Sequence, residues 1–290
     1  MIVQDLVRKN LISPPRWLPD NMVYLVVSGS TLYGMNDESS DQDLVGITIP
    51  PKDMIFPHLA GEIQGFGKKH DRFENWLKHG VVDGDKEYDL NIFSIVRWFH
   101  LAMENNPNTL EILFAPQNYV LCCTQIGQLI RENRKLFIHK GLRHKYARYA
   151  FAQRNRAKSQ DKTGKRKEIV DKYGYDIKSA AHCIRLLSQG IQLLAEGDLD
   201  IQREAEMLKD IKRGEWSWEQ VCSYFDQKEQ QLEGLYTDSK LPYKPDEEQI
   251  KALLLECLNL HYHYTDSSCV VIKNKAEVAL AEIKKIVEGV

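Results

Sequence analysis

Two hydrophobic patterns divide the chain. In the first part, short apolar runs alternate with polar segments, and residues 23–27 and 44–49 have the length and β-branched composition of buried strands. In the second part, apolar positions recur mostly at helical spacing, most strongly over residues 175–196. The pattern predicts an α+β protein, with a small sheet and flanking helices in residues 1–140 and an all-helical domain in residues 141–290.

The same signals predict the smaller elements. A strand is expected over residues 86–91, and residues 63–76 are expected to form a flap without regular structure. Asn108 is predicted to cap the start of a short helix, with Glu111 as its capping-box partner. The apolar spacing predicts later helices at residues 202–212, 217–235, 246–262 and 275–288.

Polar residues follow the first strand and open the second. Asp41 and Asp43 are two residues apart, so in an extended chain they point to the same face, roughly 6.6 Å apart. Two such carboxylates can both reach metal ions about 3.5–4 Å apart, as in phosphoryl-transfer sites. Gly29 lets the backbone approach a phosphate, and Ser30 can donate to its oxygens. The sequence therefore predicts a nucleoside triphosphate at the Gly-Ser turn, with two Mg²⁺ ions, or Mn²⁺, beside the carboxylates.

Together, the strand, Gly29-Ser30, Asp41-x-Asp43 and the second strand resemble the signature of DNA-polymerase-β-type nucleotidyltransferases. A surface turn and a solvated acidic strand end would explain either motif alone, but not the combination. The resemblance implies a polymerase-β-like catalytic domain built on a mixed sheet, in which Asp41 and Asp43 are catalytic and bind metal, and Gly29 and Ser30 bind nucleotide. It also implies a third carboxylate on a neighbouring strand. Asp89 is the expected residue, and Glu87 on the same strand face is the alternative.

Two further stretches resemble a predicted nucleotidyltransferase family associated with RNA-repair pathways. Residues 87–114 have that family's acidic strand, amphipathic helix and Asn-Pro-Asn segment, and residues 173–187 match a helix of its second half. In related enzymes a cation from the helical half clamps the triphosphate. Lys178 is expected in that role, with Arg185 supporting it or contacting nucleic acid, while a solvated basic stripe is the alternative reading.

Charge is distributed unevenly along the chain. The net charge is −2, yet residues 131–172 contain fifteen Lys or Arg and only four Asp or Glu. This excess suggests a polyanionic partner, and it favours the 3′ end of an RNA, a tRNA or a cleaved RNA, as the acceptor, bound by Arg154 and Lys158. Little acid is expected nearby to neutralise the cations of these helices, which are Arg143, Lys145, Arg148, Arg154, Arg156 and Lys158. Transfer of AMP to a protein or small molecule, and RNA binding without catalysis, are the alternatives. The preferred nucleotide, the acceptor's identity and the oligomeric state are left open.

The remaining features exclude other classes of protein. No apolar run is long enough to cross a bilayer, and the first residues lack the layout of a signal peptide, so we expect a cytoplasmic protein without a membrane partner. The six cysteines have no Cys-x-x-Cys spacing, so neither zinc nor structural disulfides are expected.

Overall fold

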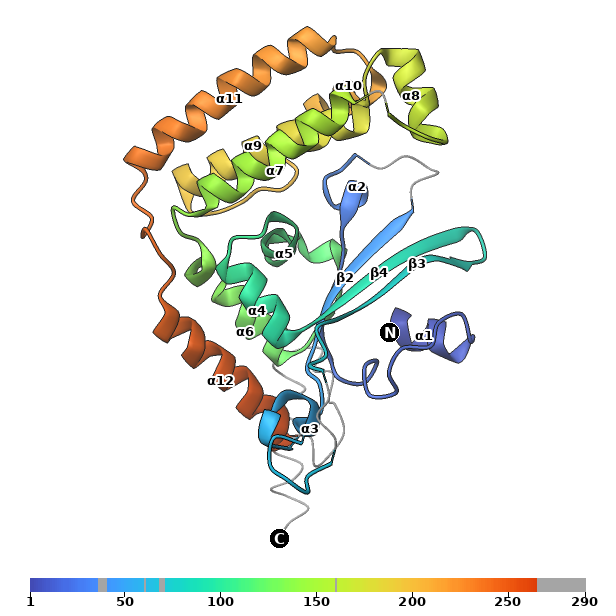
Figure 1. Ribbon diagram of the computed structural model, residues 1–290, viewed down its shortest axis with the longest axis vertical. Helices are drawn as coiled ribbons and strands as arrows, with labels where there is room; N and C mark the ends of the chain where they lie inside the picture. Colours follow the sequence, from blue (N-terminus) through green and yellow to red (C-terminus); the bar gives the residue numbers. More distant parts are fainter. Residues whose placement is uncertain (36–40, 60, 68–70, 160, 265–290) are drawn as a thin grey trace.

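A five-stranded sheet lies at the centre of the first part of the chain (Figure 1). The computed structural model describes residues 1–35, 41–59, 61–67, 71–159 and 161–264. The strand order of the sheet is β3-β4-β2-β1-β5. Strands β2 and β4 are parallel, and the other neighbouring pairs are antiparallel. The predicted mixed sheet is therefore confirmed. The strands are β1 (Met22–Val27), β2 (Gln42–Thr48), β3 (Asn75–Asp83), β4 (Lys86–Ser94) and β5 (Val120–Cys123).

Strand β1 is buried along its whole length because both faces of the sheet are covered. Leu25 and Val27 belong to a cluster with Val3 and Leu6 of α1 (Ile2–Arg8). Tyr24 and Val26 belong to a larger cluster on the opposite face, which is packed against helices. The helices and turns around the sheet are α2 (Gly29–Leu32), α3 (Lys52–Ile55), η1 (Pro57–Leu59), α4 (Ile95–Met103), α5 (Pro107–Leu110), η2 (Glu111–Phe114), η3 (Gln117–Tyr119), α6 (Gln125–Glu132) and η4 (Arg134–Phe137).

The second part of the chain is helical, as predicted. Helix α9 is buried over most of its length because α7, α10 and α11 pack around it. Asp176 begins α9 by accepting hydrogen bonds from the amides of Lys178 and Ser179, and Gly197 ends it in the left-handed conformation. These helices are α7 (Leu142–Lys158), α8 (Lys165–Tyr173), α9 (Ile177–Glu196), α10 (Ala205–Arg213) and α11 (Trp218–Asp238).

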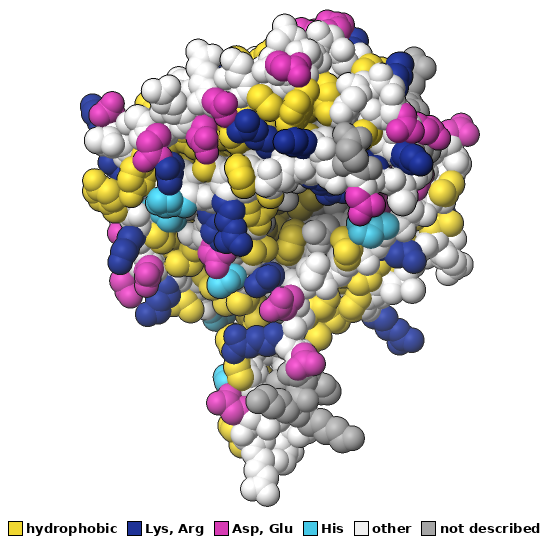
Figure 2. Space-filling view, turned by 45° about the horizontal axis from the view of Figure 1, so that its top comes forward, with side chains coloured by type: hydrophobic (Ala, Val, Ile, Leu, Met, Phe, Trp, Pro, Cys, Tyr) yellow, Lys and Arg dark blue, Asp and Glu magenta, His cyan; other side chains and the backbone are white. Residues whose placement is uncertain are grey.

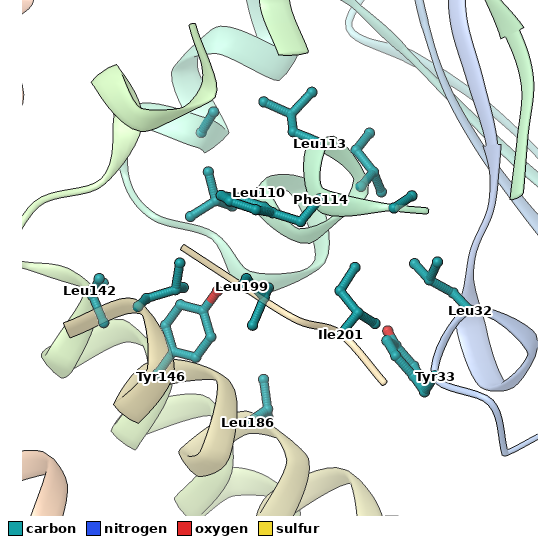
Figure 3. Close-up of a cluster of buried hydrophobic side chains, with 14 of the residues drawn as sticks. Leu32, Tyr33, Leu110, Leu113, Phe114, Leu142, Tyr146, Leu186, Leu199 and Ile201 are labelled. Atoms are coloured by element: carbon teal, nitrogen blue, oxygen red, sulfur yellow. The ribbon is translucent and has the colours of Figure 1, made fainter. Parts of the chain in front are cut away.

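The two parts share one hydrophobic core. Figure 3 shows side chains from α2, η2, α7, α9 and the segment that carries Leu199 and Ile201 meeting in a single cluster. Helix α12 (Glu247–Tyr264) returns to the first part, where it packs on α6 and the Tyr262 hydroxyl donates to the Pro50 carbonyl at 2.6 Å (Figure 1). The division at residues 140 and 141 stays a prediction. No helix within the described ranges is both long and apolar enough to cross a membrane.

Two local predictions are wrong, and one cannot be compared. The predicted flap ends in regular structure, because residues 75 and 76 already belong to β3. Asn106, not Asn108, caps α5, and its side chain accepts from the Asn108 amide while Pro107 takes the first helical position. Glu111 is therefore no capping-box partner, and its carboxylate is buried against other partners. The predicted helix at 275–288 lies outside the described residues.

Candidate active site

Parallel pairing of β2 and β4 places Asp43 directly beside Asp89. Neighbouring strands are about 4.8 Å apart, and both residues line the same cavity, which has a volume of about 260 Å³. Burial raises the pKa of Asp43, and the negative charges of Asp89 and Asp41 raise it further. The site therefore concentrates negative charge that a bound cation would neutralise.

The turn after β1 fits closely against the first of these carboxylates. Gly29 has φ +62°, and a Cβ atom at this position would overlap the Oδ2 atom of Asp43. The Ser28 amide donates to the Asp43 carbonyl at 2.8 Å, and Ser30 follows in the first turn of α2. Only glycine allows this approach, so the turn and the carboxylate are held as one unit.

A bulge in β3 holds the second carboxylate. The register of β3 against β4 shifts between Lys78 and Val81, and Gly80 inside the bulge has φ +65°. Its amide donates to Oδ1 of Asp89 at 2.8 Å, and Nδ1 of His79 lies 2.9 Å from Oδ2. Both oxygens of Asp89 are thus engaged. His79 was not predicted from the sequence, although a glycine inside a strand, such as Gly80, is a signal for a bulge.

The other two acidic candidates are more open to solvent. Asp41 is exposed just before β2, and its negative charge is one of the causes that raise the pKa of Asp43. Glu87 is exposed and pairs across the hairpin with Val82. Among the described residues, no three His, Cys, Asp or Glu side chains form a ready metal cluster. The all-oxygen set that Asp43 and Asp89 offer is nevertheless the type that Mg²⁺ prefers.

Part of the cavity wall belongs to a buried polar network. The Tyr33 hydroxyl donates to Oε1 of Glu111 at 2.5 Å, and Nη1 of Arg185 donates to Oε2 at 2.5 Å. The Arg185 guanidinium also lies over the Tyr33 ring, 3.9 Å from its centroid. Because Tyr33 and Glu111 line the cavity, this network ties helix α9 to the turn that carries Gly29.

Comparison with known proteins identifies the family. The sequence profile of RlaP, the RNA repair pathway DNA polymerase beta family, matches residues 6–255. The chain belongs to this family. The RlaP match confirms the polymerase-β-like nucleotidyltransferase interpretation and makes the protein a transferase. No curated protein matches the chain.

One solved structure similar to this RlaP chain is a nucleotidyltransferase-like protein from Exiguobacterium sibiricum 255-15. It is 13% identical, and the alignment covers 81% of this chain and 73% of that one with a TM-score of 0.30.

Helix α9 of this RlaP-family protein carries the predicted triphosphate clamp. Lys178 is exposed in the first turn, and no ion pair to it occurs within the described ranges. His182, one turn further on, has a pKa lowered to about 3 by burial and by the charges of Arg185, Arg156 and Arg166. Arg185 itself is only 3% exposed and pairs with Glu111. Of the two predicted cations, Lys178 is therefore the one open to solvent.

The predicted acceptor-binding residues on α7 have different surroundings. Arg154 pairs with Asp226 of α11 at 2.8 Å and lies over the Phe225 ring, whereas Lys158 is exposed. Arg143 pairs with Glu233, and Lys145 pairs with Glu104 at 2.7 Å. The expectation of little neighbouring acid is therefore wrong for Arg143, Lys145 and Arg154. The cations of α7 that are exposed and form no ion pair with a described residue are Arg148, Arg156 and Lys158.

Proposed function

We propose that this protein transfers a nucleoside monophosphate from a nucleoside triphosphate to a hydroxyl group at an RNA 3′ end. The observation that carries the proposal is the side-by-side placement of Asp43 and Asp89 in one cavity, with the Gly29 turn packed against Asp43. The acceptor oxygen attacks the α-phosphorus, the bond from that phosphorus to the β-phosphate bridging oxygen breaks, and pyrophosphate leaves. The hydroxyl proton goes to solvent.

Three carboxylates have the metal-binding role. Asp43 and Asp89 line the cavity together, and Asp41, exposed two residues before Asp43, is the remaining ligand that the family resemblance implies. Bound Mg²⁺ supplies positive charge that stabilises the leaving pyrophosphate and lowers the pKa of the attacking hydroxyl. The contacts of His79 and Gly80 fix the Asp89 carboxylate so that one orientation is available for the acceptor side of the reaction.

The nucleotide is held between the two parts of the chain. The Gly29-Ser30 turn approaches the phosphates, because it has no side chain at Gly29 and presents amide donors at the start of α2. Lys178 reaches the triphosphate from α9. In this assignment residues 1–140 carry the chemistry, and residues 141–290 clamp the nucleotide and bind the acceptor. Arg154 contacts an acceptor only by giving up its ion pair with Asp226.

The proposal is tested by following label from each α-³²P-labelled nucleoside triphosphate into purified total RNA, cell protein and small molecules, with and without Mg²⁺. We expect Mg²⁺-dependent labelling of RNA by the wild type and none by Asp43→Asn. Labelling of protein or a small molecule instead would overturn the choice of RNA. Absence of label from all fractions, in a protein that binds Mg²⁺ and nucleotide, would overturn the transfer reaction.

A further inference from the structure

The outward face of α7 combines an exposed aromatic ring with exposed cations. Phe151 is 53% exposed near the middle of the helix. Three further exposed side chains follow helical spacing from Phe151: Arg148 precedes it by three residues, and Asn155 and Lys158 follow it by four and seven. This spacing places the four side chains on one helix face. We call this set the α7 face; Arg156 is exposed on another side of the helix.

The charge of the α7 face is not neutralised by its neighbours. Two cations on the side turned to α11, Arg143 and Arg154, pair with acids of that helix. Arg148, Arg156 and Lys158 form no ion pair within the part of the chain that the structure describes. A single exposed apolar side chain is ordinary in a protein surface. An exposed phenylalanine among unpaired cations is instead the combination that binds stacked bases and their phosphates.

The side of α7 away from Phe151 contacts the first part of the chain. Tyr149 is two residues before Phe151 and therefore almost on the opposite side of the helix, and its hydroxyl accepts a hydrogen bond from Asn106 at 3.2 Å, next to the α5–η2 segment that lines the cavity. Arg156 is also close enough to His182 to lower its pKa, and His182 lies on the α9 face that carries Arg185. Figure 2, which turns the helical part forward, shows Lys and Arg side chains gathered beside a hollow in this side of the molecule.

We propose that the α7 face binds the single-stranded part of an RNA acceptor. A base stacks on Phe151, and the flanking phosphates pair with Arg148 and Lys158. A single strand fits this surface better than a duplex, because only unpaired bases offer a free ring to an aromatic side chain, whereas duplex RNA presents phosphates and 2′-hydroxyls. The inference rests on the proposed function for its choice of RNA, but binding can be measured without catalysis.

The experiment measures the binding of a fluorescent single-stranded RNA 12-mer to the full chain by anisotropy, without nucleotide or Mg²⁺. Phe151→Ala should weaken binding by about 5- to 100-fold, the range for one stacked base, and leave the salt dependence unchanged. Arg148→Gln combined with Lys158→Gln should reduce the slope of log K against log salt by about 1.4, since each phosphate contact on a single strand contributes about 0.7.

Two matched variants control for general effects. Phe66 is also 53% exposed but lies in the segment before β3, so Phe66→Ala should leave RNA affinity within twofold of the wild type. Arg143→Gln removes a cation that is already paired with Glu233, so the salt slope should stay the same. Thermal melts of all variants check that they fold.

Two results of the binding experiment would overturn the inference. One is Phe151→Ala binding within twofold of the wild type. The other is tighter binding of an RNA duplex than of the single strand. Failure of the proposed function gives a different result. If the protein binds RNA through the α7 face but transfers no nucleotide, the inference is supported and the proposed reaction is overturned. If the protein transfers nucleotide and Phe151→Ala leaves the KM for RNA unchanged, the proposed reaction is supported and the inference is overturned.

Discussion

Arg185 of α9 and Glu111 of η2 form an ion pair buried between the helical part and the sheet. Their side chains are 3% and 1% exposed, and the Nη1–Oε2 distance is 2.5 Å. Gln189 and the Tyr33 hydroxyl complete the partners of this pair. The pair fixes the position of Tyr33, three residues after Ser30, against α9. The predicted nucleotide site therefore depends on packing between the two parts of the chain.

Breaking this pair should destabilise the protein strongly. Arg185→Met leaves the Glu111 carboxylate buried without its cation, and removal of one partner from a buried pair costs about 3–5 kcal/mol. Urea denaturation measures the loss. The double variant Arg185→Met with Glu111→Leu replaces both charges by apolar groups, so it should recover more than half of the lost stability. If the double variant is no more stable than the single one, the unpaired carboxylate is not the cause.

Gly29→Ala should weaken nucleotide binding by more than its effect on backbone stability alone would explain. An alanine with positive φ costs about 1–2 kcal/mol wherever it occurs, but at Gly29 the new Cβ also displaces the Asp43 carboxylate. Gly84 is the matched control, because it has φ +63° and no neighbouring atom within 4 Å of an added Cβ. Both variants should lose similar stability in urea, while only Gly29→Ala should lose at least tenfold in affinity for Mg²⁺-nucleotide by calorimetry. Equal affinities would contradict the close contact.

Asp43→Asn should separate stability from activity in a pH-dependent way. The pKa of Asp43 is raised in the folded protein by burial, then by Asp89 and Asp41. Its ionised form therefore disfavours folding above the raised pKa, and this penalty disappears as the pH falls below the unfolded value of about 3.9. The variant should be more stable than the wild type at pH 7.5 and equal near pH 3, in urea midpoints without metal. Transfer should fall at least about 100-fold. If Asp43→Asn is less stable than the wild type at pH 7.5, the ionised Asp43 carboxylate is not destabilised by burial and by repulsion from Asp89 and Asp41.

The sequence predicted the elements whose apolar positions are buried in a regular pattern. Strand β1 is buried throughout, and α9 has an apolar side over its whole length, so both were found within about two residues. Strand β3 was missed because it is a sheet edge on which Val81 is the only residue buried, which leaves no alternation to detect. Its pairing depends on β4, not on its own composition.

The site was only partly predictable for a related reason. Neighbouring residues in the sequence define the Gly29 turn and the Asp41-x-Asp43 motif, so a local pattern is enough to find them. The partner of Glu111 is 74 residues away along the chain, and a local capping pattern gave Glu111 the wrong partner. The placement of Asp43 against Asp89 needs β2 and β4 to be parallel neighbours. The family resemblance implied only a third carboxylate on a neighbouring strand, and the hydrophobic pattern implied no strand pairing.

His79 should act on the reaction by positioning Asp89. The His79 side chain is 65% exposed, so His79→Ala should change stability by less than about 0.5 kcal/mol. Loss of a hydrogen-bond partner from a metal-binding carboxylate typically costs 10- to 100-fold in metal affinity or activity. We therefore expect weaker Mn²⁺ binding, measured by electron paramagnetic resonance, and a lower kcat with an unchanged KM for nucleotide.

Three further variants separate this role from the alternatives. His79→Asn keeps a donor near Oδ2 of Asp89 and should recover part of the lost activity, whereas Val82→Ala, exposed on the same strand, should have no effect. Asp89→Asn should bind nucleotide but fail in transfer, because the acceptor side of the site loses its carboxylate. Glu87→Gln should remain close to the wild type, since its side chain is exposed away from the cavity lining. If Glu87→Gln is the more damaging of the last two variants, Glu87 is the third metal-binding carboxylate, and the contact from His79 to Asp89 has no part in the reaction.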